Sequence, residues 1–148
     1  MDSVCRFSYM ESPRSPRAPR GKAKQRAPVV LLADDVEDNR EMYREFLAFH
    51  GMRVLTATNG REALDEAFSH HPDAIVLDLS MPDIDGWEAC RRLKADERTK
   101  GIPILAVSGH ALKGAEGAAK AAGCDVYLIK PCLPERVLAE INKMLGVN

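Results

Sequence analysis

"AIVLDLSMPDIDG", residues 74–86, places a carboxylate directly after an apolar run. Residues 74–77 lack the alternation of a half-exposed strand, a pattern typical of a parallel strand that is covered on both faces. Because an ionised side chain is costly to bury inside a sheet, we expect Asp78 to emerge at the carboxyl end of this strand. Ligands bind at that edge in open α/β sheets, so this stretch is the starting point for both fold and function.

Four more apolar runs occur in the chain, and segments of helical periodicity separate them. The five runs are residues 29–32, 54–55, 74–77, 104–107 and 126–129. Strands that alternate with helices form a parallel sheet joined by right-handed crossovers. We therefore predict an α/β fold, a doubly wound (βα)5 sandwich with a five-stranded parallel sheet, of the flavodoxin-like kind.

Capping residues indicate where the helices begin and end. Asp38, Asn59 and Asp85 each precede a glutamate by three positions, the spacing of an N-cap followed by an acid at the third helical position. Pro134 suits the first turn of the last helix. We expect helices to stop at Gly51 and Gly123.

Two helices have informative apolar patterns. The first is expected to bury Met42, Phe46 and Phe49 against the sheet. The fourth, Ala111 to Ala122, contains two glycines among many alanines, which weakens a helix and leaves a thin hydrophobic face. We therefore expect the fourth helix to be the most mobile one.

Size and charge divide the chain into an arm and a domain. The 148 residues are 45% hydrophobic, enough for one compact domain. Residues 1–27 hold seven basic and two acidic residues, a charge of +5, and are rich in proline, arginine and serine. We predict a disordered basic tail over 1–27 and one folded domain over 28–148. Such an arm can touch nucleic acid or an acidic surface.

The sequence also indicates a compartment. No apolar stretch approaches the roughly 20 residues that cross a bilayer, and the N-terminus lacks the apolar region of a secretory signal, so we expect a cytoplasmic protein without membrane contact. The four cysteines, Cys5, Cys90, Cys124 and Cys132, show no metal-ligand spacing. We expect four reduced thiols.

Polar side chains follow the ends of four predicted strands. The first ends in Asp34-Asp35, the third in Asp78, the fourth in Ser108 and the fifth in Lys130. Because the carboxyl ends of parallel strands share one edge, these side chains are expected in a single cleft. Three close carboxylates repel unless a cation or protons separate them, and hard oxygen donors suit Mg²⁺ or Mn²⁺.

This combination favours phosphoryl transfer. Mg²⁺ prefers one or two carboxylates together with phosphate oxygens, which implies a phosphorylated substrate or intermediate. Asp78, at the centre of the edge, is the natural nucleophile for an acyl phosphate. Lys130 would counter the charge of the transferring group, and the Ser108 hydroxyl could hydrogen-bond the product.

The chain resembles the response regulator receiver domains of two-component signalling from about residue 29 to residue 145. The motifs that carry the resemblance are "LLADDVEDN" (31–39), "IVLDLSMPDIDG" (75–86), "ILAVSGH" (104–110) and "AAGCDVYLIKP" (121–131), in that order. The resemblance implies that Asp78 accepts a phosphoryl group from a phosphohistidine. It also implies that Asp34, Asp35, Asp78 and the backbone carbonyl of Ser80 hold Mg²⁺.

Further roles follow from the same resemblance. Lys130 would pair with the phosphoryl oxygens, and the peptide bond into Pro131 is typically cis in the family. Ser108 and Tyr127 are similar to the paired switch positions, where the hydroxyl moves toward the phosphate and the aromatic ring turns inward. Ser108 stands where threonine is more usual, and it retains the hydroxyl that the switch needs.

The resemblance implies a single-domain response regulator that catalyses only its own phosphorylation and dephosphorylation. Its partners would be a sensor histidine kinase or a histidine phosphotransfer protein, and an output protein bound through the fourth helix, fifth strand and fifth helix. Nucleic acid contact is expected only through the basic tail. Two alternatives remain: a receiver-like docking module that is not phosphorylated, and a phosphohydrolase of the haloacid dehalogenase type, whose second acid would stand where Ser80 is.

Overall fold

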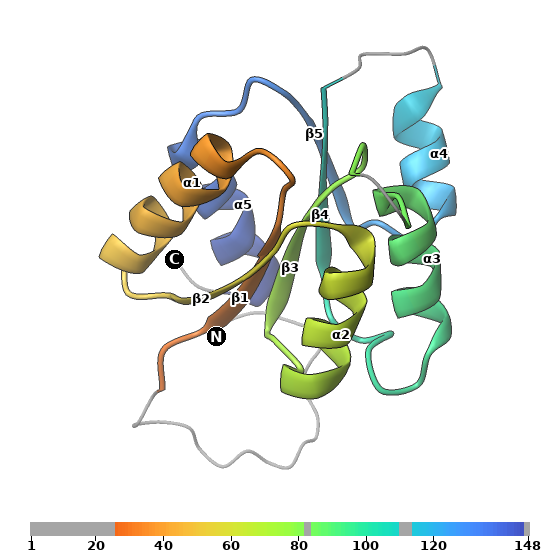
Figure 1. Ribbon diagram of the computed structural model, residues 1–148, viewed down its shortest axis with the longest axis horizontal. Helices are drawn as coiled ribbons and strands as arrows, with labels where there is room; N and C mark the ends of the chain where they lie inside the picture. The colour runs from red at the N-terminus through yellow and green to blue at the C-terminus, as the bar shows by residue number, and fades with distance from the viewer. Residues whose placement is uncertain (1–25, 82–83, 110–113, 147–148) are drawn as a thin grey trace.

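The computed structural model describes residues 26–81, 84–109 and 114–146, apart from the side chain of Ala115 (Figure 1). Strands and helices alternate along this part of the chain as β1 (Val29–Ala33), α1 (Glu37–Phe49), β2 (Arg53–Ala57), α2 (Gly60–His70), β3 (Ala74–Asp78), α3 (Gly86–Ala95), β4 (Ile104–Ser108), α4 (Ala115–Ala121), β5 (Val126–Ile129) and α5 (Pro134–Leu145). All strand pairs are parallel and their order is β2-β1-β3-β4-β5. The predicted fold is confirmed.

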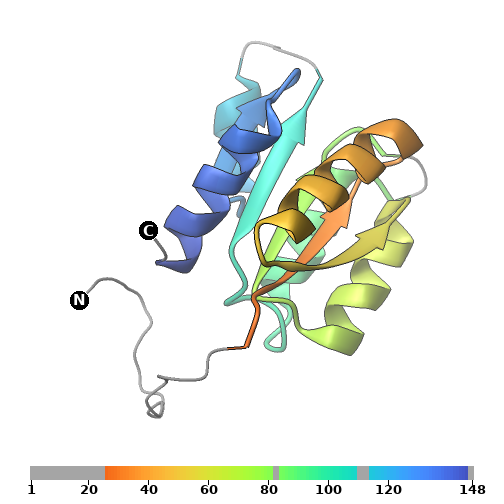
Figure 2. The same ribbon diagram turned by 90° about the vertical axis from the view of Figure 1, so that its left-hand side faces the viewer.

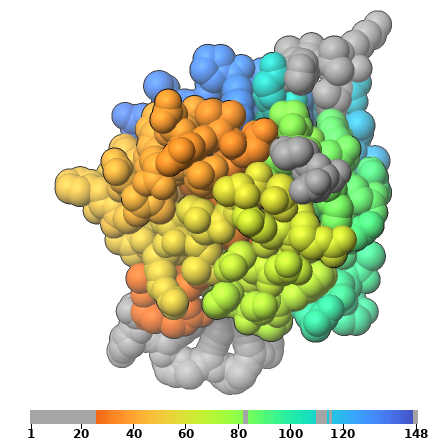
Figure 3. Space-filling model, viewed as in Figure 1, coloured from red at the N-terminus to blue at the C-terminus, as the bar shows by residue number. Residues whose placement is uncertain are grey.

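Helices cover both faces of the sheet. In Figure 2, α1 and α5 lie together on the near face, and α2, α3 and α4 lie on the other face, as Figure 1 shows from the side. Each layer has its own hydrophobic cluster: Leu47 and Ile141 belong to the one under α1 and α5, whereas Leu64 and Leu93 belong to the other. β2 is an edge strand, and α1, β2 and α2 form adjoining parts of the surface in Figure 3.

The central strand is β3, and it explains the apolar run of the opening stretch. β3 pairs with β1 on one side and with β4 on the other. All five of its residues are buried, including Asp78 at its carboxyl end. A strand covered on both faces needs apolar side chains in both directions, which is why this sequence lacks alternation.

Two of the three predicted helix N-caps are confirmed, and one is wrong. The side chains of Asn59 and Asp85 accept hydrogen bonds from the backbone N–H three residues on. Asp38 instead lies inside the first turn of α1, whose N-cap is Val36. The Asp34 carboxylate accepts the Val36 N–H at 2.9 Å, so the turn after β1 starts the helix earlier than the capping pattern indicated.

Other helix boundaries agree with the sequence. Gly51 and Gly123 follow α1 and α4 with φ of +90° and +103°, the left-handed conformation that glycine adopts without steric cost. Pro134 is the first residue of α5. The expected start of the fourth helix at Ala111 lies outside the described residues, and its greater mobility stays a prediction.

The expected inner face of α1 is wrong in part. Met42 is 42% exposed and Phe49 is 85% exposed, and Phe46 is only partly buried. Tyr43 and Leu47, four residues apart on one helix face, are the buried residues of α1. Tyr43 tolerates burial because its hydroxyl has a hydrogen-bond acceptor, the carbonyl oxygen of Cys132.

Most of the expected tail, residues 1–25, lies outside the described part of the chain. At its inner end the guanidinium of Arg26 pairs with the Asp73 carboxylate at 3.3 Å. Asp73 also accepts the Val29 N–H at 2.7 Å, which joins the start of β1 to the turn before β3. Among the described helices, none has the length and apolar character needed to span a membrane.

Candidate active site

Four strand ends deliver the candidate side chains to one edge of the sheet. Asp34 follows β1, Asp78 ends β3, Ser108 ends β4 and Lys130 follows β5. Because all strands are parallel, these ends share an edge, with β3 between β1 and β4. A small pocket at this edge is lined by Asp34, Asp78 and Lys130, together with Tyr43 and apolar side chains of β1, β3, β4 and α5.

Lys130 ties the two buried carboxylates together. Its Nζ lies 3.1 Å from Oδ2 of Asp78 and 3.4 Å from Oδ2 of Asp34. Both aspartates are only 3% exposed. Burial acts to lower the pKa of Lys130, but the hydrogen bond and charge of Asp78, assisted by Asp34, outweigh it and hold that pKa above its ordinary value. The ammonium is therefore charged at neutral pH.

Burial has the opposite effect on Asp34. It raises the pKa of this carboxyl above the usual value, although the Val36 N–H and Lys130 both favour the ionised form. The nearby Asp78 carboxylate adds to the increase. Asp34 is thus a carboxylate that is only partly compensated by its protein neighbours.

The donor set fits a hard divalent cation. Asp34, Asp35 and Asp78 each offer a carboxylate oxygen, and these oxygens lie within 4.8 Å of one another. Three carboxylates against the single ammonium of Lys130 leave a charge of −2 when all are ionised. Mg²⁺ would neutralise that charge with the oxygen donors that it prefers.

The turn after β3 holds Asp78 in place. Oδ1 of Asp78 accepts hydrogen bonds from the backbone N–H of Ser80 at 3.0 Å and from its hydroxyl at 2.9 Å. The other carboxylate oxygen, Oδ2, accepts a hydrogen bond from Lys130. Gly86 packs against this turn so closely that a Cβ there would lie 2.3 Å from the Asp78 carbonyl oxygen, so only glycine fits.

The expected switch residues lie on neighbouring strands. Ser108 is buried at the end of β4, and its carbonyl oxygen accepts the Lys130 N–H at 2.7 Å. Tyr127 is partly buried against the cluster under α2 and α3. The peptide bond between Lys130 and Pro131 is cis, as the resemblance implied.

Two residues of α1 support the site and were not expected from the sequence. The Tyr43 hydroxyl donates to the Cys132 carbonyl oxygen at 2.6 Å, which fastens the turn that carries Lys130. The Arg40 guanidinium donates to the Asp34 carbonyl oxygen at 2.9 Å. Both acceptors are backbone carbonyls. That of Cys132 is distant in sequence from Tyr43, and that of Asp34 lies in the turn before α1, so no motif could have indicated either contact. The tyrosine on an apolar helix face was the one available signal.

Comparison with known proteins identifies this arrangement. The family model of the response regulator receiver domain matches residues 30–142. The chain belongs to the response regulator receiver family. Among curated relatives, the polar-differentiation response regulator DivK of Brucella ovis is 36% identical over 117 residues, which cover 79% of this chain and 95% of that protein. DivK of Brucella anthropi is 35% identical over the same coverage.

Solved receiver structures have the same fold. A putative response regulator from Chloroflexus aurantiacus has a TM-score of 0.77 and 32% identity over 81% of this chain and 98% of that one. Chemotaxis protein CheY4 of Vibrio cholerae has a TM-score of 0.76 and 32% identity over 80% and 99%. The receiver domain of a Pseudomonas aeruginosa sensor histidine kinase, with a TM-score of 0.74 and 28% identity over 80% and 98%, holds a magnesium ion in its active site cleft.

Family membership establishes the broad function. Receiver domains are signalling proteins of two-component systems, generally not enzymes, and the family binds Mg²⁺ in its active site. In this chain the three acids Asp34, Asp35 and Asp78 form the group that could hold the metal.

Proposed function

We propose that this receiver domain is a phosphorylation switch in which Asp78 accepts a phosphoryl group from a phosphohistidine of a sensor kinase or a histidine phosphotransfer protein. The observation that carries the proposal is the contact of Lys130 with both Asp78 and Asp34 at the carboxyl edge of the sheet. The proposed compartment for this step is the cytoplasm, as the sequence led us to expect.

The proposed reaction is an in-line transfer. A carboxylate oxygen of Asp78 attacks phosphorus, a P–O bond forms, the P–N bond to the donor imidazole breaks, and the leaving nitrogen keeps the electron pair. Ser80 holds Oδ1 through two hydrogen bonds, so Oδ2 beside Lys130 is the candidate nucleophile. Lys130 then offsets the added charge of the phosphoryl oxygens.

Asp34, Asp35, Asp78 and the backbone carbonyl of Ser80 would hold Mg²⁺, which supplies charge neutralisation to the phosphoryl oxygens when bound. Mn²⁺ has the same preference for oxygen donors and could replace it. The buried, incompletely compensated Asp34 supports this assignment.

The proposed output is a protein contact through α4, β5 and α5. Ser108 would donate its hydroxyl to the phosphoryl group and Tyr127 would turn inward, which shifts a pre-existing equilibrium toward the binding-competent state. Ile129 at the end of β5 and Leu133 before α5 are 47% and 71% exposed, so this face offers apolar side chains to a partner. Contact with nucleic acid would involve only the basic tail.

Intact mass spectrometry tests the proposal. We expect incubation with a small-molecule phosphodonor and Mg²⁺ to add one phosphoryl group that survives acid but is lost in base or hydroxylamine. A chelator and the Asp78→Asn variant should each abolish the adduct. Asp65→Asn, which removes an exposed acid on α2, is the matched control and should be phosphorylated like the wild type.

The other outcomes separate the alternatives. Turnover of phosphate esters, without a persistent adduct, would favour the phosphohydrolase. A folded protein that binds Mg²⁺ but takes up no phosphoryl group, either from the small donor or from its kinase, would contradict the proposal and favour a docking module.

A further inference from the structure

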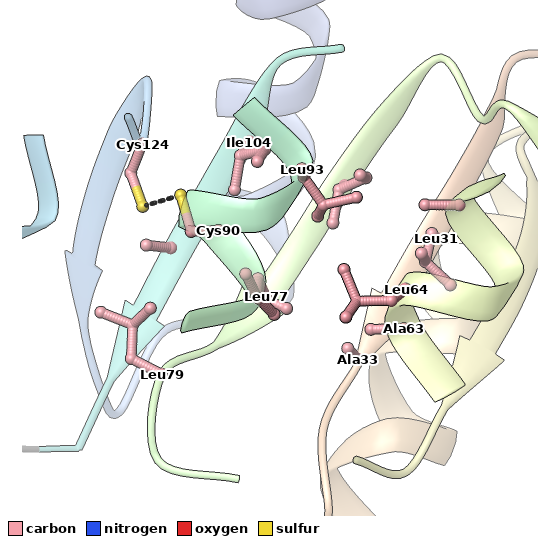
Figure 4. Packing of buried hydrophobic residues seen from close by; sticks show 14 of the residues in the cluster. Leu31, Ala33, Ala63, Leu64, Leu77, Leu79, Cys90, Leu93, Ile104 and Cys124 are labelled. Atoms are coloured by element: carbon pink, nitrogen blue, oxygen red, sulfur yellow. Dashed lines mark hydrogen bonds between the residues drawn. The ribbon is translucent and has the colours of Figure 1, made fainter. Parts of the chain in front are cut away.

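Two cysteines meet in the hydrophobic cluster under α3 and α4. Cys90 lies on α3, and Cys124 lies between α4 and β5. Their sulfur atoms are 3.0 Å apart, and Figure 4 shows them facing each other among Leu77, Leu93 and Ile104. Ordinary contacts between apolar side-chain atoms are about 3.5–4.0 Å, so this pair is closer than simple packing requires.

The pair is chemically asymmetric. Either thiol can donate in the contact between Cys90 and Cys124, and the Cys90 thiol also has an acceptor in the carbonyl oxygen of Ala122 at 3.4 Å. Hydrogen bonding from Cys124 lowers the pKa of Cys90 against the opposing effect of burial, and the Lys94 ammonium nearby favours the thiolate as well. Lys94 is itself held by Asp125, with 3.1 Å between Nζ and Oδ2. Cys90 is therefore the better nucleophile of the two.

We propose that Cys90 and Cys124 form a redox modification site that a peroxide converts to an intramolecular disulfide. The sulfurs need to approach by only about 1 Å to reach the bond length of about 2.05 Å. This inference does not depend on phosphorylation of Asp78. Cys90, Cys124 and Cys132 are free cysteines in the structure, so the proposed bond would be a modification of the arrangement described here.

The reaction balances with one hydrogen peroxide as oxidant. The Cys90 thiolate attacks a peroxide oxygen, an S–O bond forms, the O–O bond breaks, and the departing hydroxide takes the proton that Cys90 released. The Cys124 sulfur then attacks the sulfenic sulfur of Cys90. The S–S bond forms, the S–O bond breaks, and hydroxide leaves with the Cys124 proton. Two thiols and one peroxide give one disulfide and two waters.

For peroxide to reach the buried cysteines, α4 would have to open. α4 has only seven residues, with Gly117 in its interior. Of its side chains from Glu116 to Ala121, all of which the structure describes, Ala119 alone is buried. We expect a short helix with a glycine and one buried methyl group to open at low cost, and its opening to expose Cys124.

The test uses the full chain with Cys5→Ser and Cys132→Ala, so that only the candidate pair remains. After treatment with hydrogen peroxide, the protein is denatured and alkylated. We expect both thiols to become unreactive, the mass to fall by two hydrogens, no disulfide-linked dimer to form, and a reducing agent to restore both thiols. Because the bond would close a long loop, the oxidised protein should melt roughly 5–10 °C higher.

Single substitutions provide the controls. Cys90→Ser and Cys124→Ser, or the alanine variants if these fail to fold by circular dichroism, should show no two-hydrogen loss and no rise in melting temperature. Peptide mapping of the oxidised pair identifies the bond directly without these variants. The proposal is overturned if both thiols stay reactive after oxidation, if each gains oxygen separately, or if the bond forms only in urea.

Discussion

Single residues at the sheet edge act through the backbone as much as through side-chain chemistry. Gly86 is required because the turn after β3 leaves no space for a Cβ beside the Asp78 carbonyl. Ser80 aligns the Asp78 carboxylate with two hydrogen bonds. Tyr43 fastens the turn that carries Lys130, although it lies on α1, far from Lys130 in the sequence. Placement of the charges therefore depends on residues that carry no charge themselves.

Tyr43→Phe tests this support. Removal of the hydroxyl leaves the Cys132 carbonyl without its 2.6 Å donor. We expect the free energy of unfolding, measured by urea denaturation, to fall by about 1 kcal/mol. Because the acceptor is a backbone atom, the same loss should occur in a Cys132→Ala background. An unchanged unfolding free energy in both backgrounds would show that water replaces the tyrosine at no cost.

At the level of elements, the start of each helix depends on what precedes it. α2 begins after Asn59, whose side chain accepts the Glu62 N–H at 2.9 Å. The Glu62 carboxylate in turn accepts the Thr58 N–H and hydroxyl, each at 2.8 Å. α1 begins after Val36, whose N–H is already bound by Asp34. Asp34, a residue of the site, therefore sets where α1 begins. The capping spacing used for the sequence does not include this contact.

A pair of alanine variants compares a residue that caps its helix, Asn59, with one that only has the capping spacing, Asp38. Asn59→Ala should lower the unfolding free energy by about 1 kcal/mol because α2 loses its cap. Asp38→Ala, which has the same capping spacing but lies inside α1, should change it by no more than about 0.5 kcal/mol. Chemical denaturation of both variants at neutral pH gives the comparison. Equal losses would contradict the assignment of Val36 as the N-cap.

In the whole molecule, the ionised form of the buried Asp34 opposes the stability of the fold. Burial raises the pKa of Asp34 above its ordinary value of 3.8, so ionisation of this group is less favourable in the folded chain than in the unfolded one. Its contribution to stability is therefore lost as the pH rises from that ordinary value through the folded pKa, and the loss persists at neutral pH. The position of Asp34 therefore suits a bound cation and lowers the stability of the metal-free fold.

Asp34→Asn should accordingly melt at a higher temperature than the wild type in metal-free buffer at about pH 7. Asn retains an oxygen for the Val36 N–H but has no charge to bury. The difference in melting temperature should shrink as the pH is lowered toward the ordinary value of 3.8, because the wild-type carboxyl, whose pKa is raised in the folded chain, becomes protonated on the way. A variant less stable than the wild type at neutral pH would show that the pairing with Lys130 outweighs burial.

Mg²⁺ should reverse this order. A ligand that binds only the folded state at ten times its dissociation constant adds about 1.4 kcal/mol, which calorimetry detects as a higher melting temperature. We expect this increase in the wild type and in Asp65→Asn, and little of it in Asp34→Asn. Equal increases in all three proteins would place Mg²⁺ away from the acidic group.

The sequence by itself determined the alternation of strands and helices and the positions of Asp34, Asp78, Ser108 and Lys130 at strand ends, because periodicity and strand ends are local properties of the chain. It was wrong at two places on α1. The N-cap depends on a contact between Asp34 and Val36, two residues apart, that the capping spacing does not include. The inner face depends on a long-range contact, because the Tyr43 hydroxyl finds its acceptor at Cys132. The pairing of Cys90 with Cys124 likewise required the packing of α3 against the segment before β5, since residues 34 positions apart meet only when the sheet forms.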